Sequence, residues 1–175
     1  MTVIAYKNGE CWSDDLITCG GFIYGRELKL VYRKRDGAIA GASGTASPCS
    51  EFLKWAKTGR GKPPAVFAGE LSVGQAFIVT RDGVVRDFSG PEPSLIECDF
   101  YAIGKGSEIA YGAMMAGCSA KEAVIHACRA YGWPASLHGV NHDGEWSEVP
   151  IEEVHSPIHG GRTPRLPSTA DGRRT

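Results

Sequence analysis

The sequence predicts an α+β domain in which two sheets are layered between helices. Three observations lead to this class. The expected elements run in the order strands, one helix, strands, two helices and two closing strands. Two connections, Asn8-Gly9 and the turn at residues 81–83, have the composition of hairpin turns, so neighbouring strands pair locally and antiparallel. Sheets formed from such pairs need helices on their outer faces, which the order of elements supplies.

Composition indicates one globular domain with no strongly charged character. The chain has 175 residues, enough to bury a core without disulfides, and a net charge of -1. This balance argues against a nucleic-acid partner or an anionic membrane. No apolar run approaches the roughly 18 residues of a membrane span, and the start of the chain lacks a signal-peptide pattern. The six cysteines are scattered without a CxxC pair, so we expect reduced thiols in a cytoplasmic protein.

The first helix is expected to begin at Ser47-Pro48, which has N-cap and N1 character, and to end near Thr58 before Gly59. The strands expected before it are residues 3–6, 11–13, 16–19, 22–26, 27–33 and 38–42.

After the first helix, the sequence pattern predicts further strands and then two more helices. Ser119 is the expected N-cap of the second of these helices. The expected strands are residues 75–80, 84–88, 96–103, 135–140 and 145–149, and the expected helices are residues 107–116 and 120–130. From about His155 the sequence is rich in Pro, Gly, Arg and Ser, so we expect a domain over residues 1–154 and a disordered tail over residues 155–175.

Thr2 is the residue for which the sequence indicates the most specific chemical role. Removal of Met1 would leave a threonine whose hydroxyl is a nucleophile and whose own α-amino group is a base. The reference pKa of such an amine is about 7.7–8.0, so a useful fraction is neutral near physiological pH. The β-rich run that follows at residues 3–6 would hold this terminus in a sheet. An ordinary first strand is the alternative interpretation.

Two histidine pairs have the spacing of metal ligands. They are His138 with His142 and His155 with His159. Both pairs lie in Gly- and Pro-rich sequence rather than on a helix, and no CxxC accompanies them. We therefore expect no metal and no other cofactor.

Several positions in one order resemble the proteasome β-subunit family, most closely its bacterial HslV-type branch. The stretch at residues 39–46, IAGASGTA, resembles the family's small-residue strand and turn before its first helix. The stretch at residues 100–106, FYAIGKG, resembles the family's AIGSG segment. The match covers about residues 2–150 and implies the four-layer αββα sandwich of N-terminal-nucleophile hydrolases. The positions that match near the start of the chain are Thr2, Asn8, Gly9, Asp14, Thr18, Gly20 and Lys29.

The resemblance implies roles for individual residues. Thr2 would be the nucleophile, with Asp14 as the acidic residue and Lys29 as the lysine beside it. A lysine ammonium near the hydroxyl lowers the cost of the alkoxide and favours the neutral amine, and an aspartate keeps that cation oriented. Backbone N–H groups around Ser43 and Gly44 would supply an oxyanion hole. Taken singly, Asp14 and Lys29 also fit an acid at a strand end and a solvated strand lysine.

Three positions depart from the family pattern. Lys105 stands where the family has the serine of GSG. Arg129 and Gly132 stand where proteasome subunits often carry an aspartate and a serine that complete the proton network. We expect these three residues to surround the site from a second layer. Added cations there would either lower the pKa of the amine further or disable the site.

The resemblance implies a threonine endopeptidase that hydrolyses polypeptides inside a homo-oligomeric ring. The ring would be a hexamer or heptamer, either single or stacked in a pair, and would work with an ATP-dependent unfoldase. One alternative is a catalytically weak or inactive assembly subunit. Another is an amidohydrolase that acts on a small amide through the same residue.

Overall fold

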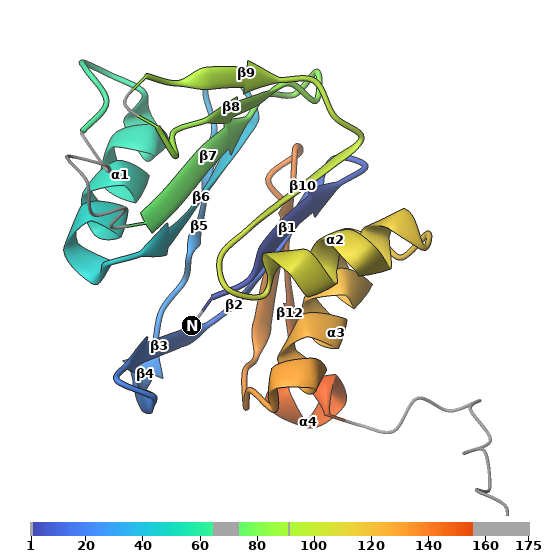
Figure 1. Ribbon diagram of the computed structural model, residues 1–175. Helices are drawn as coiled ribbons and strands as arrows, with labels where there is room; N and C mark the ends of the chain where they lie inside the picture. Colours follow the sequence, from blue (N-terminus) through green and yellow to red (C-terminus); the bar gives the residue numbers. More distant parts are fainter. Residues whose placement is uncertain (1, 65–73, 91, 156–175) are drawn as a thin grey trace, which may run out of the picture.

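The computed structural model describes residues 2–64, 74–90 and 92–155, and it confirms the α+β class (Figure 1). This part of the chain forms three antiparallel sheets and four helices. The strands are β1 (Ile4–Lys7), β2 (Glu10–Asp14), β3 (Leu16–Cys19), β4 (Phe22–Arg26), β5 (Leu30–Arg33), β6 (Ala38–Gly44), β7 (Gly74–Val79), β8 (Val85–Asp87), β9 (Ser94–Ile96), β10 (Phe100–Ile103), β11 (Leu137–Asn141) and β12 (Trp146–Val149). The helices are α1 (Ala46–Thr58), α2 (Ser107–Met115), α3 (Ala120–Tyr131) and α4 (Ile151–Val154).

The first five-stranded sheet has the order β10-β1-β2-β11-β12. Its central hairpin turns at Asn8 and Gly9, whose φ angles are 51° and 85°. A turn with two positive φ angles has the twist that antiparallel strands need, so the predicted hairpin is confirmed. The hairpin places the start of the chain beside Asp14, because Ile4 pairs with Ser13 across the two strands.

The second five-stranded sheet has the order β5-β6-β7-β8-β9. Small residues in β6 allow the two sheets to approach closely. A Cβ added to Gly41 would meet the side chain of Phe77 at 3.0 Å and that of Ile4, on the other sheet, at 3.2 Å. The hairpin predicted around Asp82 and Gly83 joins β7 to β8, as expected.

The two sheets share one apolar core between them. Side chains that alternate along β1 divide between this core and the helical side, with Ile4 and Tyr6 facing the second sheet and Val3 and Ala5 facing the helices. Helix α1 packs on β5, β6 and β7, whereas α2 and α3 pack on the first sheet (Figure 1). Within the described ranges, no helix is both long and apolar enough to cross a membrane.

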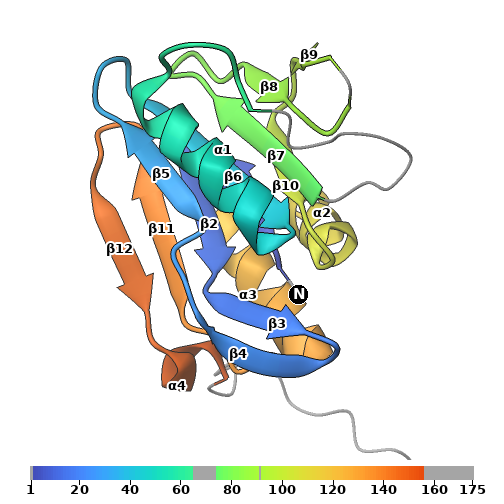
Figure 2. The same cartoon turned by 90° about the vertical axis from the view of Figure 1, so that its left-hand side faces the viewer.

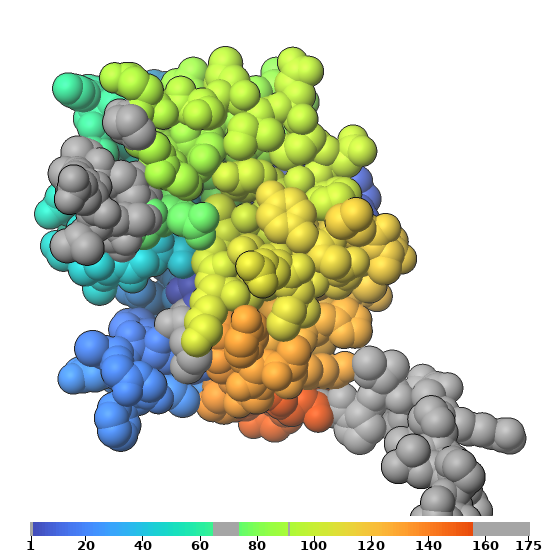
Figure 3. Space-filling model, in the orientation of Figure 1, coloured from blue at the N-terminus to red at the C-terminus, as the bar shows by residue number. Residues whose placement is uncertain are grey.

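Strands β3 and β4 form a separate two-stranded hairpin beside the start of β1 (Figure 2). In the space-filling view this hairpin is a blue lobe set below α1 (Figure 3). Its outer side chains are apolar and exposed, with 76% of Phe22 and 73% of Tyr24 accessible to solvent. A hairpin of this size is marginally stable alone, so its position depends on contacts with the rest of the domain.

One predicted strand is divided between the two sheets. Residues 96–103 were expected to form a single strand, but Ile96 ends β9 in the second sheet and Phe100 begins β10 in the first. The chain between these residues crosses from one sheet to the other (Figure 1). The polar residues Glu97 and Asp99 interrupt the apolar run, and each short strand then pairs with a different partner.

The start of α1 also differs from the prediction. The N-cap is Thr45 rather than Ser47, and its side chain makes no capping hydrogen bond. Pro48 still lies in the first turn, where its missing N–H has no intrahelical partner to lose. The end of the helix is as predicted, because Gly59 adopts φ 61°. In α3, Ser119 and Glu122 form the full capping box.

The end of the described chain contains a short helix that the sequence pattern did not predict. Helix α4 follows Pro150, and the imidazole of the next residue, His155, lies 2.6 Å from the carbonyl oxygen of Trp133. His155 was assigned to the tail, but its side chain contacts the domain. The rest of the predicted tail, residues 156–175, lies outside the described residues.

Candidate active site

Thr2 is held by the turn between β10 and α2. The residue lies just before β1 and is 8% exposed. Its carbonyl oxygen accepts a hydrogen bond from the backbone N–H of Gly106 at 3.1 Å. Gly104 in the same turn has φ 91°, and a Cβ there would collide with the carbonyl of Thr2. The glycines of the FYAIGKG segment therefore allow the turn to close on Thr2.

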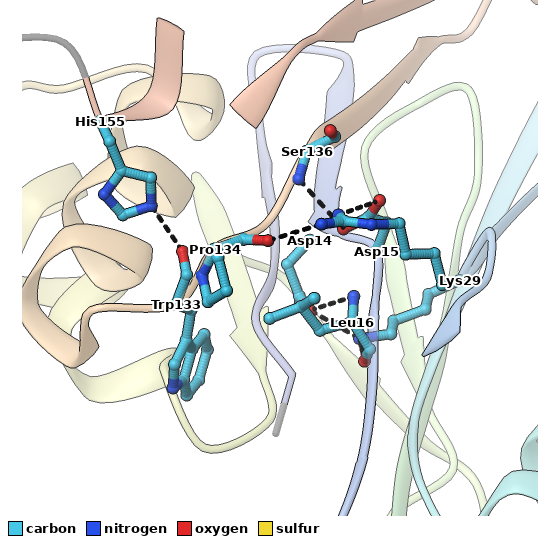
Figure 4. A network of polar contacts seen from close by, with 9 residues as sticks. Asp14, Asp15, Leu16, Lys29, Trp133, Pro134, Ser136 and His155 are labelled. Atoms are coloured by element: carbon cyan, nitrogen blue, oxygen red, sulfur yellow. Dashed lines mark hydrogen bonds and ion pairs between the residues drawn. The ribbon is translucent and has the colours of Figure 1, made fainter. Parts of the chain in front are cut away.

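Lys29 connects the Thr2 hydroxyl to a carboxylate. Its Nζ donates to Thr2 Oγ1 at 3.1 Å, to Asp14 Oδ2 at 2.7 Å and to the carbonyl of Leu16 at 2.6 Å. The side chain is 4% exposed and extends from the residue before β5 toward Leu16 and Asp14 (Figure 4). A buried ammonium is tolerated only when it is paired and hydrogen-bonded, and these three acceptors meet that requirement.

Asp14 is oriented by backbone donors as well as by Lys29. Its Oδ1 accepts from the N–H of Val3 at 2.7 Å, and its Oδ2 accepts from the N–H of Leu16 at 3.0 Å. The carboxylate is fully buried at the end of β2. Because Val3 follows Thr2 directly, the same carboxylate holds both the ammonium and the backbone of the first strand. The chemical result is a threonine hydroxyl fixed beside a paired cation.

A pocket of about 810 Å³ opens beside Thr2. This size is in the range of small-molecule and peptide side-chain sites. One wall is the β3–β4 hairpin with the segment that leads to Lys29, and the other is the end of β6 with the start of α1. The described residues that line it are Thr2, Leu16, Ile17, Thr18, Cys19, Tyr24, Glu27, Lys29, Gly44, Thr45 and Ala46.

The two residues expected to form an oxyanion hole lie at the end of β6. Gly44 lines the pocket, and Ser43 pairs with Gln75 in β7. The side chain of Gln75 accepts from the N–H of Gly104 at 2.8 Å, which ties the end of this strand pair to the turn that holds Thr2. The structure thus brings both residues to the side of Thr2. Their role as oxyanion donors stays a prediction.

A second polar network fixes the hairpin wall of the pocket. Arg26 Nη1 contacts both carboxylate oxygens of Asp15 at 2.7 Å, and its Nη2 donates to the carbonyl of Pro134 at 2.8 Å. Asp15 also accepts from the N–H of Ser136 at 3.0 Å (Figure 4). The guanidinium therefore joins the end of β4 to the segment before β11.

We expect Arg26→Met to lower the free energy of unfolding by about 1–2 kcal/mol, because it leaves the nearly buried Asp15 carboxylate without its cation. Arg81→Met is the matched control, since Arg81 and its partner Asp143 are mostly exposed and their pair contributes about 0.5 kcal/mol or less. Urea unfolding of both variants measures the difference. Equal losses would contradict a role for Arg26 in holding the wall.

The three residues expected in a second layer make their described contacts away from Thr2. The Lys105 ammonium lies over the Tyr131 ring, 5.7 Å from its centroid. Arg129 donates to the carbonyl of Val154 in α4. Gly132 ends α3 with φ 63°. The resemblance implied that these residues lie near the site, but Lys105 is exposed and lies over Tyr131, and α3 ends with its own C-cap.

Two cysteines near the site are poor nucleophiles. Burial, with a contribution from the Glu27 carboxylate, raises the pKa of the Cys49 thiol to about 11. Burial and the nearby Asp14 carboxylate raise the pKa of the Cys128 thiol well above its usual range. Both thiols stay protonated near neutral pH, and the thiolate is the reactive form. All six cysteines of the chain are free.

Sequence reasoning missed most of the pocket wall. It read residues 16–26 as two strands but did not assign any of their side chains, or Glu27, to a site. The available signal was the Gly20-Gly21 turn, where both residues have positive φ. Such a tight turn predicts that the two strands pair as a hairpin, and the pairing brings Leu16 opposite Arg26.

The histidine pairs do not form a metal site in the described part of the chain, where no group of three or more His, Cys, Asp or Glu side chains is arranged to hold an ion. His142 Nδ1 lies 2.7 Å from the carbonyl oxygen of Gly37, which gives this ring a structural partner. His159 lies outside the described residues.

Comparison with models of known protein families finds no match, and comparison with curated proteins finds none either.

Proposed function

We propose that the protein is a threonine-type peptidase whose nucleophile is Thr2 once the residue before it has been removed. The observation that carries this proposal is the buried chain of contacts from Thr2 Oγ1 through Lys29 Nζ to Asp14, beside a pocket of about 810 Å³. A solvated strand lysine and a turn aspartate, the ordinary alternatives for these two residues, are both exposed. Here Lys29 and Asp14 are buried and paired.

The layering supports the same class of enzyme. Two sheets lie face to face with helices on their outer sides, and the candidate nucleophile lies two residues before the first strand. We infer that this is the four-layer αββα sandwich of N-terminal-nucleophile hydrolases. In such an arrangement the sheet holds the terminal residue rigidly, which an amine and a hydroxyl on one residue require for proton transfer.

The proposed reaction uses groups of this chain only. The free amine of Thr2 accepts the proton of Oγ1, and Oγ1 attacks the carbonyl carbon of the peptide bond. Lys29 stabilises the developing negative charge on Oγ1 through its hydrogen bond. The tetrahedral intermediate collapses to an ester on Thr2, and the departing amine takes the proton from the ammonium of Thr2. Water then attacks the ester with the same amine as base, which releases the acid and restores the hydroxyl.

Gly44 has the position that oxyanion stabilisation needs. It lies at the end of β6, where the strand passes into α1, and it lines the pocket with Thr2. Its φ of 141° is one that other residues rarely adopt. We infer that its backbone N–H donates to the oxyanion, which forms only during the reaction.

Intact-mass measurement of the purified protein tests the proposal directly. We expect a mass that corresponds to a chain starting at Thr2. A peptide epoxyketone, which reacts with a hydroxyl and an amine on the same residue, should add once, and peptide mapping should place the adduct on Thr2. A chain that retains Met1, or one that starts at Thr2 and gives no adduct, would contradict the proposal.

We also propose that the protein forms a ring of six or seven copies that encloses the sites, acts on unfolded polypeptide and receives it from an ATP-driven unfoldase. Exposed apolar side chains beside the pocket, Phe22, Ile23, Tyr24 and Leu28, supply surface for contacts between copies. Light scattering at micromolar concentration should give the mass of a hexamer, a heptamer or twice either number. A monomer under these conditions would contradict the ring.

An assembly subunit without turnover is the second candidate. The exposed apolar hairpin favours it, because an interface needs this surface whether or not Thr2 reacts. A ring-sized mass combined with retained Met1 would support this function over the first. An amidohydrolase for small amides would instead give the Thr2 adduct in a protein that does not form a ring.

A further inference from the structure

The pocket beside Thr2 has one carboxylate in its wall. Among its described lining residues, Glu27 has the only acidic side chain and Lys29 has the only cationic side chain. Most of the remaining lining is apolar or carries only a hydroxyl, from Leu16 through Tyr24 on the hairpin side. A charged group that enters this pocket therefore interacts mainly with the charges of Glu27 and Lys29.

The two charges are not equally available. Lys29 is 4% exposed and is paired with the Asp14 carboxylate at 2.7 Å, so its charge is balanced inside the protein. Glu27 is exposed, and within the described ranges its carboxylate is in no ion pair. Its backbone N–H donates to the carbonyl of Asp15 at 2.8 Å, which fixes the chain beside the Arg26 network.

The carboxylate of Glu27 also lies within electrostatic range of α1. It contributes to the raised pKa of Cys49, which lies in the first turn of α1. Thr45 and Ala46, at the start of the same helix, line the pocket. Cys49 lies with Glu27 along a neighbouring pocket and is not among the described residues of this one, so Glu27 lines both pockets.

We propose that this pocket selects peptides with a cationic side chain, lysine or arginine, at the residue whose carbonyl is attacked by Thr2. The inference rests on the proposed function and names the substrate class of the same site. An exposed carboxylate that lines a largely apolar pocket and is in no ion pair among the described residues gains a charge-assisted contact when a cation enters. The stem of a lysine or arginine side chain packs against the apolar wall while its charged end reaches Glu27.

One feature of the pocket opposes this selection. The start of α1 carries the positive end of a helix dipole, equivalent to about half a charge, and Thr45 does not cap it with its side chain. That end favours an anion. The dipole term is smaller than the full charge of Glu27 and falls off within the first turn, and the Lys29 charge is already balanced by Asp14. Among the described side chains that line the pocket, Glu27 therefore carries the one charge that is not in an ion pair.

Three fluorogenic peptides that differ only in the residue before the reporter amide test the inference. With arginine, leucine or glutamate at that position, we expect kcat/KM to fall in this order, with arginine roughly tenfold above leucine, the factor for one charge-assisted contact open to water. Glu27→Gln should remove most of this ratio by raising KM for the arginine peptide. Glu27→Lys should reverse the order of arginine and glutamate.

Glu148→Gln is the matched control, because Glu148 is exposed on β12 and does not line the pocket. It should leave all three rates unchanged. Equal hydrolysis of the arginine and leucine peptides by the unaltered protein would overturn the inference and leave the proposed function standing. A preference for glutamate would overturn it as well, and would indicate that the positive end of α1 determines the specificity of the pocket. Absence of hydrolysis for every peptide, without an adduct on Thr2, would overturn both.

Discussion

Thr2→Ala is expected to abolish peptide hydrolysis while leaving the fold and the assembly intact. The substitution removes the Oγ1 that Lys29 contacts at 3.1 Å, and with it the proposed nucleophile. It removes little packing, because the backbone carbonyl of Thr2 keeps its hydrogen bond from Gly106. Turnover of a fluorogenic peptide and the thermal midpoint of unfolding should be measured on the same preparation.

Thr2→Ser is the matched control for this prediction. It keeps the hydroxyl and the free amine and removes only a methyl group, so part of the activity should remain. A Thr2→Ala protein that still hydrolyses the peptide at the original rate would show that another residue attacks the bond. If Thr2→Ser loses as much activity as Thr2→Ala in protein from which Met1 has been removed, the hydroxyl group alone does not explain the activity.

Lys29→Ala is expected to reduce kcat/KM by about a hundredfold or more, the scale of losing an electrostatic partner in the transition state. The loss follows from its position, since one ammonium contacts the Thr2 hydroxyl, Asp14 and the Leu16 carbonyl together. The same substitution leaves the buried Asp14 carboxylate without its cation, which costs about 3–5 kcal/mol of stability. Activity must therefore be compared on protein that is shown to be folded.

A double variant separates the two effects of Lys29. Asp14→Asn combined with Lys29→Met removes both buried charges. An asparagine side-chain oxygen still accepts from the N–H of Val3, while the N–H of Leu16 loses its acceptor, which costs less than an unpaired buried charge. We expect this protein to unfold at a higher temperature than Lys29→Ala but to remain inactive. Lys34→Ala, an exposed lysine just after β5, should change neither property. Recovery of activity in the double variant would contradict electrostatic assistance by Lys29.

The contacts at Thr2 explain how one short strand both builds the fold and positions a reactive group. Asp14 accepts from the backbone of Val3 and from the ammonium of Lys29, so the hairpin β1–β2 and the candidate site share one carboxylate. Substitutions at Asp14 should therefore alter stability and activity together. Substitutions at Glu27, which is exposed in the pocket wall, should alter substrate preference with little change in stability.

Local sequence predicted the elements whose structure depends on neighbouring residues. Asn8-Gly9 specified a hairpin because both residues accept positive φ, and Ser119 specified a helix start because its side chain can cap the backbone. The division of residues 96–103 between two sheets was not predictable in this way. Both β9 and β10 satisfy strand preferences, and only their different partners separate them.

For the candidate site, the residue types alone indicated which side chains have the required chemistry, and the resemblance selected Thr2, Asp14 and Lys29 among them. Their mutual contact depends on the fold, because the residues before β5 and at the end of β2 meet through pairing and packing of separate sheets. The fold also decided that Lys105 points toward Tyr131 and that Glu27 enters the pocket wall. Side-chain direction at a turn depends on backbone angles and on the neighbours that the whole fold supplies, and short-range sequence does not encode those neighbours.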